Sequence, residues 1–466
     1  MNNLSGKHVL VLGLGESGLA AACWCARQGA WVRVADTRAA PPYLAELKRR
    51  IASAEFVAGE FDKALLDGID LLVLSPGLSG GLMVVIHARA AGIPVVGEIE
   101  LFAQGLRDLD PSVPVLAITG TNGKTTTTAL TGHLLRATGK IVGVAGNISP
   151  AALTALMDAQ DADALPQVWV LELSSFQLET TESLNPVAAT VLNISDDHLD
   201  RYIDLDEYAS TKARIFQSAP EAPGVQVLNR ADPRVRRMAL ADRRIITFGL
   251  DAPAAADDFG LRQNRGELWI VQGGRHLLPV SALPLAGLHN AANAMAALAL
   301  CSTLGFDANA LLPALRSFRG LAHRVEEIAE LDGVVWYDDS KGTNVGATVA
   351  ALEGIGGTGR KVVVILGGDG KGQDFAPLKQ AVARHARAVV LIGRDGPLIE
   401  KAIAGSRVTA KNVVDMSDAV HRARALARPG DAVLLSPACA SFDMFRNYEH
   451  RAQVFVAAVR ALEAAA

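Results

Sequence analysis

The chain has 466 residues, half of them hydrophobic and a fifth charged, which predicts a globular protein of about three domains. Its formal net charge of −4 excludes a global basic field that would attract nucleic acid, so local positive groups must hold any anionic ligand. The four scattered cysteines predict reduced, mostly buried thiols, and no apolar run reaches membrane-spanning length. We therefore expect a cytoplasmic protein with no nucleic-acid or membrane partner.

The first segment predicts a dinucleotide-binding βαβ unit. It contains, in order, a strand, a glycine-rich turn, a helix and a second strand, at residues 8–12, 13–18, 19–28 and 31–35. Such a turn presents backbone N–H groups to a pyrophosphate, and the acid that follows, Asp36, meets a ribose. Any nucleoside diphosphate offers both groups, so the motif does not establish NAD, and a tight turn that binds nothing is the alternative. Because an inward Glu16 side chain would repel a diphosphate, we expect backbone contacts there.

A second glycine-rich segment, residues 118–126, lies between an apolar strand and a helix-like stretch. In this context glycines turn N–H groups toward a polyphosphate, Lys124 supplies a point charge, and the Thr125 hydroxyl reaches Mg²⁺. The usual pattern has a glycine where this chain has Ile118, which indicates a variant loop. The segment predicts ATP binding, against the alternative of a glycine-rich turn without a ligand.

Apolar runs extend the alternation of strands and helices along the whole chain. We expect further strands at residues 71–74, 94–96, 115–117, 141–144, 168–171, 190–193, 334–337, 361–366, 388–392 and 432–435, and a helix at 290–304. Short runs at 225–228, 244–248 and 267–271 suggest an antiparallel appendage. The predicted class is α/β with three domains: a Rossmann-like N-terminal domain (1–107), a central P-loop-type ATPase domain with a mostly parallel sheet (108–320) and a Rossmann-like C-terminal domain (321–466).

Polar residues follow several of these strands, at the edge where ligands bind in open α/β sheets. Glu172 ends a buried strand and is a suitable Mg²⁺ ligand, with an N-cap or a surface ion pair as the alternative. His198 lies among acids after another strand, where it could ligate metal or move a proton, although a lone histidine is usually structural. Three loops of the last domain offer hydroxyl, lysine and N–H donors for a carboxylate-bearing substrate, at residues 338–344, 367–372 and 436–443.

Taken together, these segments resemble the Mur ligase family, and most closely its members that add D-glutamate. The resemblance covers nearly the whole chain and is carried by residues 120–126, 171–179, 197–202, 287–293, 323–324, 339–344 and 436–443. It implies an ATP-dependent amide ligase in the cytoplasmic stage of peptidoglycan precursor synthesis. The L-alanine carboxylate of UDP-N-acetylmuramoyl-L-alanine would take the γ-phosphoryl group as an acyl phosphate, and the amine of D-glutamate would then displace phosphate.

The resemblance also implies roles for individual residues. The uridine diphosphate end would meet Gly15, Glu16, Ser17, Asp36, Thr37 and Arg38, and the muramoyl-alanine path would be lined by Asn147, Ser174, Gln177 and His198. ATP would meet Gly120, Thr121, Asn122, Gly123, Lys124, Thr125, Thr126, Asn290, Asn293, Arg324, Asp339 and Lys341. D-Glutamate would lie among Thr343, Lys371, Ser441 and the backbone around Tyr448, where the family often has phenylalanine. Two Mg²⁺ sites would use Thr125, Glu172, His198 and Lys212.

Catalysis is assigned mainly to Mg²⁺, Lys124 and Arg324, because the task is to neutralise phosphate charge. His198 is a candidate base for the amine, but a metal ligand is a poor base, so its two roles compete. Lys212 matches by position the family's carbamylated lysine. An ammonium about 4 Å from a divalent ion would cost about 8 kcal/mol at an effective dielectric near 20, and a CO2-derived carbamate reverses that sign. The alternative is an ordinary surface lysine.

Three other functions remain to be weighed. An NAD-dependent oxidoreductase would leave the ATP loop and the last domain without a task, and nicotinamide fluorescence quenching against protection by a UDP-sugar would discriminate it. An ATP-gated binding module would release no phosphate. A ligase adding another amino acid, or extending folate, is the third, although the first domain argues against folate. We expect a monomer acting on small molecules, since no helix shows a long unexplained apolar face.

Overall fold

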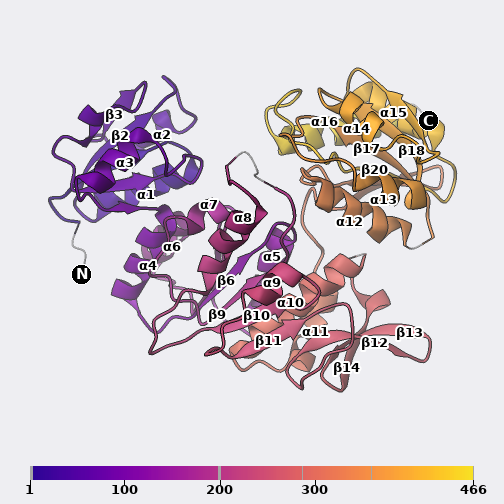
Figure 1. Cartoon of the computed structure of the whole chain (residues 1–466), viewed down its shortest axis with the longest axis horizontal. Coiled ribbons are helices and arrows are strands. Elements are labelled where there is room, and N and C mark those ends of the chain that lie inside the picture. Colours follow the sequence, from indigo (N-terminus) through magenta and orange to yellow (C-terminus); the bar gives the residue numbers. More distant parts are fainter. Residues whose placement is uncertain (1–3, 198–200, 286, 358, 465–466) are drawn as a thin grey trace.

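The computed structural model describes residues 4–197, 201–285, 287–357 and 359–464. Figure 1 shows three α/β lobes, with the N-terminal and C-terminal lobes on either side of the central one. Each lobe has its own sheet, and the sheets are mostly parallel, which confirms the predicted three-domain α/β class. None of the helices within these ranges is both long and apolar enough to cross a membrane.

The N-terminal lobe contains a five-stranded parallel sheet in the order β3-β2-β1-β4-β5. Its strands are β1 (His8–Leu12), β2 (Trp31–Asp36), β3 (Glu55–Ala58), β4 (Leu71–Leu74) and β5 (Val95–Val96). Its helices are α1 (Glu16–Arg27), α2 (Leu44–Arg50), α3 (Met83–Ala90) and the short η1 (Lys63–Leu66). The strand order reverses between β1 and β4, so the carboxyl ends of these two strands border a crevice, as in other doubly wound sheets.

The central lobe contains a nine-stranded sheet in the order β14-β13-β12-β11-β10-β9-β6-β8-β7. Its strands are β6 (Val115–Thr119), β7 (Val142–Gly146), β8 (Val168–Glu172), β9 (Ala188–Val191), β10 (Val225–Asn229), β11 (Ile245–Phe248), β12 (Phe259–Asn264), β13 (Glu267–Gln272) and β14 (Arg275–Pro279). Its helices are α4 (Glu98–Leu109), α5 (Lys124–Arg136), α6 (Ala152–Asp161), α7 (Ser175–Leu178), α8 (Leu205–Ala213), η2 (Arg214–Phe216), α9 (Pro233–Arg237), η3 (Val280–Ala282), α10 (Leu288–Thr303) and α11 (Ala308–Ser317).

The expected antiparallel appendage is only partly correct. β10 pairs in parallel with β9, and β11 in parallel with β10, so both strands extend the main sheet. Only β12, β13 and β14 form an antiparallel meander at the end of that sheet. The sequence signal failed because β10 and β11 are short, and short apolar runs do not distinguish parallel from antiparallel pairing.

The C-terminal lobe contains a six-stranded sheet in the order β15-β16-β20-β17-β18-β19, parallel except for β15. Its strands are β15 (Glu326–Leu331), β16 (Val334–Asp338), β17 (Val362–Gly367), β18 (Ala386–Ile392), β19 (Thr409–Asn412) and β20 (Ala432–Leu435). Its helices are α12 (Val345–Gly356), α13 (Leu378–His385), α14 (Gly396–Ala402), α15 (Met416–Leu426) and α16 (Tyr448–Ala464). Because β16, β20 and β17 are neighbours, the loops after them meet at one edge.

Continuous apolar strands place these sheets between two helical layers. All five residues of β6 are buried, as are all six of β17. Side chains from the two faces of the central sheet belong to separate hydrophobic clusters, one that includes α6 and one that includes α5 and α10. A strand covered on both faces cannot show a polar alternation, which explains its uninterrupted apolar sequence.

The junction between the N-terminal and central lobes contains a buried carboxyl group. Glu98 begins α4 and is 3% exposed; its Oε1 accepts a hydrogen bond from the Leu153 N–H of α6 at 2.6 Å. Among the described residues its Oε2 has no hydrogen-bond partner. Burial raises the pKa of Glu98 to about 7, and the charge of Glu16 adds to this effect. At neutral pH the group therefore exchanges between its neutral and charged forms.

We expect Glu98→Gln to flatten the pH dependence of stability. The pKa of Glu98 is about 7 in the folded chain against an ordinary value of 4.5, so the folded state binds the proton more tightly. Its stabilising effect is complete below the unfolded pKa and is lost as pH rises toward 7. Between pH 5.5 and 8 the free energy of unfolding of the wild type should fall by about 2 kcal/mol, and the variant should not show this fall. Urea unfolding at both values measures this; an equal pH dependence in both proteins, or the same flattening in exposed Glu60→Gln, would contradict the assignment.

Candidate active site

The glycine-rich segment of the central lobe forms a tight loop between β6 and α5. Gly123 caps the helix with a φ of +84°, and a Cβ there would lie 2.5 Å from Oδ1 of Asn293. The Asn122 N–H donates to Oδ1 of Asn193 at 2.8 Å, and the amide of Asn193 returns a bond to the Asn122 carbonyl at 3.0 Å. The loop is thus fixed from the strand beside it. Its helix N-terminus has no side-chain cap, which leaves N–H groups for an anion.

Lys124 folds back over this loop. Its Nζ donates to the carbonyls of Gly120 at 2.9 Å and Thr121 at 2.8 Å. Burial lowers the pKa of Lys124, while the nearby carboxylates of Glu172 and Asp197 oppose that shift. The Lys124 and Glu172 side chains therefore share one buried centre, as strand pairing also requires, because Glu172 lies beside Ile118 in the register of β8 and β6.

Glu172 is the carboxylate best placed to accept a cation. It is 1% exposed; its Oε1 accepts from the amide of Asn147 at 2.7 Å, and its Oε2 has no hydrogen-bond partner among the residues described. A buried, unpartnered carboxylate oxygen is costly unless a cation satisfies it. The Thr125 hydroxyl lies on the same loop and helix as Lys124. These oxygen donors fit Mg²⁺, which prefers carboxylate and hydroxyl ligands.

Lys212, on α8, belongs to the same centre and is not a surface lysine. It is 1% exposed, and its Nζ lies 3.4 Å from Oγ1 of Thr119 and 4.6 Å from the ring centre of Tyr208. Burial, followed by the positive charge of Lys124, holds the pKa of Lys212 well below its usual range. This shift favours the neutral amine, which is the form that can react with CO2.

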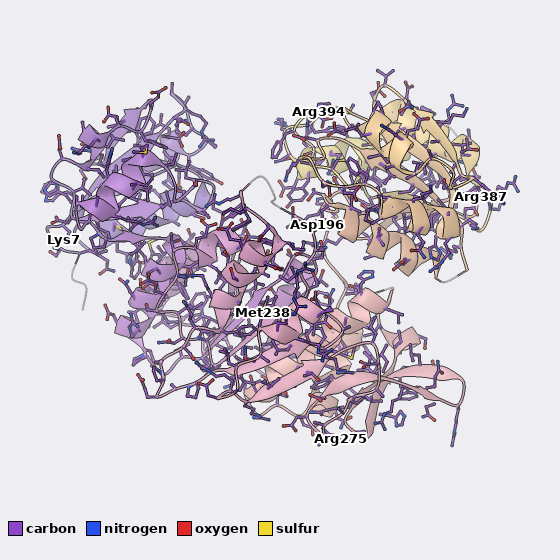
Figure 2. The ribbon with its side chains drawn as sticks, viewed as in Figure 1. Lys7, Asp196, Met238, Arg275, Arg387 and Arg394 are labelled. Atoms are coloured by element: carbon purple, nitrogen blue, oxygen red, sulfur yellow. The ribbon has the colours of Figure 1, made fainter. Side chains whose placement is uncertain are left out.

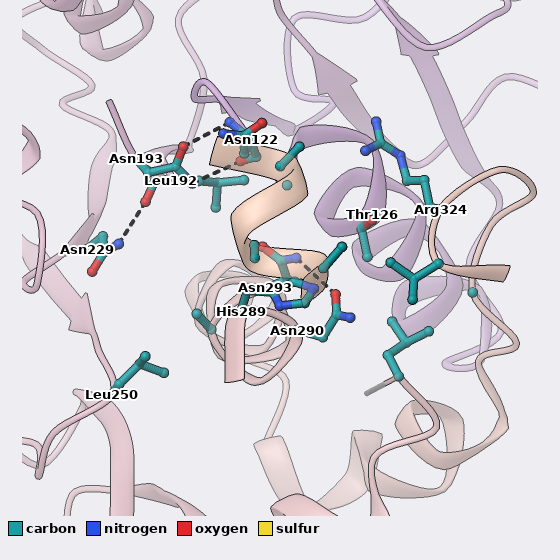
Figure 3. Close-up of a pocket in the computed structure, with 18 of the residues that line it drawn as sticks. Asn122, Thr126, Leu192, Asn193, Asn229, Leu250, His289, Asn290, Asn293 and Arg324 are labelled. Atoms are coloured by element: carbon teal, nitrogen blue, oxygen red, sulfur yellow. Dashed lines mark hydrogen bonds between the residues drawn. The ribbon is translucent and has the colours of Figure 1, made fainter. Parts of the chain in front are cut away.

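A cavity of about 260 Å³ adjoins the glycine loop (Figure 3). Asn290 and Asn293 border it from α10, and the amide of Asn293 donates to Oδ1 of Asn290 at 3.2 Å. The neighbouring His289 lines the same cavity, where burial lowers its pKa to about 4 and keeps its imidazole neutral. On the side of α10, apolar walls with a few neutral donors and acceptors suit a flat heteroaromatic base.

The C-terminal lobe reaches this centre directly. The guanidinium of Arg324 donates to Oγ1 of Thr125 at 2.7 Å, and the amide of Asn344 donates to Oδ1 of Asn122 at 3.1 Å. Arg324 and Asp339 both line the cavity. Burial raises the pKa of Asp339 to about 7, although Ser436 donates to it at 2.6 Å and Arg324 lies nearby. Lys341 interacts electrostatically with Arg324, Glu172 and Lys124. Two lobes therefore contribute to one site.

A second cavity, of about 360 Å³, lies in the crevice of the N-terminal lobe. All six residues expected to meet a uridine diphosphate line it: Gly15, Glu16, Ser17, Asp36, Thr37 and Arg38. Asp36 accepts from the Leu14 N–H at 2.8 Å and from the Arg38 guanidinium at 2.7 and 2.8 Å. The Arg38 hydrogen bonds lower the pKa of Asp36 to about 2, so it is ionised. The Glu16 carboxylate accepts hydrogen bonds from the Ser149 hydroxyl at 2.7 and 2.8 Å. It therefore points away from the glycine turn, whose glycines line the cavity.

The residues expected along the muramoyl-alanine path have local partners in this structure. Asn147 binds Glu172, whereas Ser174 and Gln177 form a capping box at the start of α7. His198 lies outside the described residues, so its metal and base roles stay predictions. The neighbouring Arg201 connects lobes, because it donates to the Pro76 carbonyl at 3.2 Å.

The three C-terminal loops meet as the strand order requires. The Ala438 N–H donates to the Gly342 carbonyl at 3.0 Å, and Asp369 and Ala440 exchange backbone bonds at 3.0 and 2.8 Å. The residues expected to meet D-glutamate are carried by these loops and by the start of α16: Thr343, Lys371, Ser441 and Tyr448. Ser441 is buried and Lys371 exposed, while the Tyr448 carbonyl already accepts from the Ser340 hydroxyl at 2.8 Å.

Sequence reasoning missed two residues that border these cavities, Ser75 and His289. Ser75 lines the N-terminal crevice directly after β4, so the strand-end rule used for Glu172 would have found it. His289 adjoins Asn290, but no sequence pattern singled it out, because its neutral state depends on burial.

Comparisons with known proteins agree with this architecture. Three family models match successive parts of the chain: "Mur ligase MurD-like, N-terminal domain" at residues 7–97, "Mur ligase middle domain" at 118–301 and "Mur ligase, glutamate ligase domain" at 323–439. The UDP-N-acetylmuramoylalanine–D-glutamate ligase of Aromatoleum aromaticum is 60% identical over 468 residues, covering 99% of both chains. The enzyme of the same name from Dechloromonas aromatica is 56% identical, again over 99% of both chains.

Solved structures share the fold at low identity. The UDP-N-acetylmuramate-alanine ligase MurC of Thermotoga maritima has a TM-score of 0.61 at 21% identity, covering 98% of this chain and 99% of that one. MurF of Acinetobacter baumannii has a TM-score of 0.62 at 17% identity, covering 99% and 92% respectively. The full-length relatives and the three successive family matches together show that this chain belongs to the Mur ligase family.

Proposed function

We propose that the chain joins D-glutamate to UDP-N-acetylmuramoyl-L-alanine with the hydrolysis of ATP to ADP and phosphate. The Mur ligase family catalyses ATP-dependent ligation in peptidoglycan precursor synthesis, and a magnesium requirement is general in it. The observation that carries the proposal is the buried group of Lys124, Glu172 and Lys212, which Arg324 approaches from another lobe. The match of the C-terminal lobe to a glutamate ligase domain supports the choice of amino acid.

The proposed reaction has two steps. A carboxylate oxygen of the L-alanine unit attacks the γ-phosphorus of ATP, the bond to the β,γ-bridging oxygen breaks, and ADP leaves. The neutral amine of D-glutamate then attacks the carbonyl carbon of the acyl phosphate, the nitrogen loses a proton, and inorganic phosphate leaves. Activation is needed because a carboxylate is a poor electrophile. Lys124, on the glycine loop, and Arg324, bonded to Thr125, would stabilise the developing phosphate charge electrostatically.

Each lobe has a proposed task. Residues 1–107 bind the uridine diphosphate end in the N-terminal crevice, residues 108–320 bind ATP, and residues 321–466 bind D-glutamate. Asn290 and Asn293 meet the adenine, while Asp339 and Lys341 reach ATP from the C-terminal lobe. Thr125, Glu172 and Lys212, the last as a carbamate, would hold Mg²⁺, which supplies charge neutralisation to the phosphates when bound. A cytoplasmic monomer is the proposed working unit, and light scattering after gel filtration tests the monomer.

Phosphate release tests the proposal. The purified chain is given Mg²⁺, ATP and UDP-N-acetylmuramoyl-L-alanine, with D-glutamate, L-glutamate, L-lysine or meso-diaminopimelate in parallel reactions. Of the four amino acids, we expect only D-glutamate to cause phosphate release, and we expect no release when the UDP-linked substrate is left out. Preference for another amino acid would overturn the choice of D-glutamate, and no release with any of them would favour a binding module.

A further inference from the structure

Arg451, on the first turns of α16, is a fully buried arginine that the proposed chemistry does not use. Its Nε donates to the Ser340 hydroxyl at 3.0 Å and its Nη2 to the Ser340 carbonyl at 2.7 Å. Its Nη1 donates to the Cys439 carbonyl at 3.1 Å. One guanidinium therefore joins two loops that are about a hundred residues apart in the sequence.

The burial of Arg451 destabilises its charged form. Arg451 has an exposed fraction of 0%, and none of the hydrogen bonds found for it within the described part of the chain goes to a carboxylate. Burial lowers the pKa of Arg451 to about 10, which still leaves it charged at neutral pH. A buried charge without a hydrogen-bonded counter-ion is destabilising, and an apolar side chain of similar volume often stabilises such a site better. Packing alone does not explain an arginine here.

The two loops carry the groups on which the proposed function depends. The first, residues 338–344, carries Asp339, Lys341 and Thr343, and the second, residues 436–443, carries Ser441. Their separation sets where the amino acid lies relative to the phosphate that it displaces.

The second loop contains a strained turn that Arg451 helps to hold. Ala438 has a φ of +58°, in the left-handed region that residues with a Cβ avoid. Its N–H donates to the Gly342 carbonyl at 3.0 Å, and its carbonyl accepts from the side-chain amide of Gln373 at 2.7 Å. The adjacent Cys439 carbonyl is the one that Arg451 binds. The conformation is thus fixed from several sides.

A hydrogen-bonded chain also runs from Arg451 toward the phosphate loop. The Ser340 N–H donates to Oδ1 of Asp338 at 2.9 Å, and Oδ2 of Asp338 lies 2.6 Å from Nδ1 of His323. His323 precedes Arg324, whose guanidinium donates to Thr125. Displacing Ser340 would therefore disturb both the amino-acid side and the phosphate side of the site.

We propose that Arg451 is a positioning residue for the amide-forming step. It sets the distance between the loops 338–344 and 436–443 through Ser340 and Cys439 and touches no substrate itself. The inference rests on the proposed function, because it assigns these loops to the amino acid and ATP.

The test compares Arg451→Met with wild type in the phosphate-release assay. Methionine keeps much of the volume and removes every donor. Since a misplacement of about 1 Å can cost about 100-fold, we expect kcat/KM for D-glutamate to fall about 100-fold, with a raised KM. The KM for UDP-N-acetylmuramoyl-L-alanine should stay within about 3-fold, because its nucleotide end binds another lobe. Arg451→Lys keeps the charge but cannot span both loops, so it should be nearly as impaired.

Arg387→Met is the matched control. Arg387 lies at the start of β18 and its Nη2 donates to Oδ1 of Asp431 at 2.8 Å, whereas Arg394 follows the end of that strand at the ligand edge. Figure 2 shows Arg387 and Arg394 on different sides of the C-terminal lobe, so Arg387 lies away from the ligand edge. Losing Arg387 should lower the unfolding temperature without changing the KM for D-glutamate.

Three results would overturn the inference. One is an unchanged KM and kcat in Arg451→Met; another is an equal loss of activity in Arg387→Met. The third, a fully active Arg451→Lys, would reduce the role to charge alone, and this variant also decides the matter if Arg451→Met does not fold. A wild-type chain that fails to use D-glutamate would instead refute the proposed function.

Discussion

Replacing Lys124 with alanine should abolish measurable phosphate release, with a fall in kcat of about 10³-fold. Lys124 is half-buried, and its ammonium lies against the glycine loop and donates to the carbonyls of Gly120 and Thr121. No other lysine in the described part of the chain lies on that loop. A point charge in a water-poor site stabilises developing phosphate charge far more than an exposed one does. Nothing in the variant would replace it.

The structure predicts how this loss divides between binding and turnover. Backbone N–H groups at the start of α5 and the cavity beside Asn290 and Asn293 remain in Lys124→Ala, so ATP affinity should fall less than kcat. Calorimetry of Mg-ATP binding and the phosphate assay measure the two quantities separately. Lys48→Ala, which removes an exposed lysine from α2, is the control and should behave as wild type. Normal turnover in Lys124→Ala would remove the assignment of this loop to ATP.

Much of the fold could be predicted because its elements carry local signals. The strand before Glu172, residues 168–171, is an uninterrupted apolar run, and the strand before Asp36 is interrupted only by Arg33. Such runs identify buried parallel strands and their ligand-binding ends. Turns with glycine at positive φ occur in the two glycine-rich loops, where Gly13 has a φ of +85° and Gly123 one of +84°.

The features that escaped prediction depend on long-range packing. The neutral imidazole of His289 and the raised pKa of Asp339 result from burial, which no local pattern encodes. Arg451 resembles any helical arginine in the sequence, and only the return of α16 to the loop of Ser340 gives it a role. Likewise, β10 and β11 pair in parallel through crossovers that contain α8 and α9, and this pairing joins segments distant in the sequence.

Replacing Lys212 with alanine should lower kcat by about 100-fold, the range observed when a group that orients metal ligands is lost. The amine is buried, its pKa is lowered by burial and by Lys124, and its one hydrogen-bonding neighbour among the described residues is Thr119 at 3.4 Å. A neutral amine attacks CO2, forms an N–C bond and releases a proton. The proposed carbamate would carry negative charge, so the repulsion between Lys212 and Lys124 would become an attraction.

Two variants separate the carbamate from the lysine that carries it. Lys212→Ala leaves a space that a small carboxylate can enter, whereas Lys212→Met fills that space with an apolar chain. Acetate or propionate should therefore restore part of the activity of Lys212→Ala and none of Lys212→Met, with sodium chloride at equal ionic strength as the control. Wild-type protein in 13C-bicarbonate should show a carbamate resonance that both variants lack. A carbamate is expected when magnesium is bound, because an ammonium beside Glu172 would repel the metal that the carboxylate attracts. Electron density that ends at a bare amine in a magnesium-loaded crystal would therefore refute the carbamate.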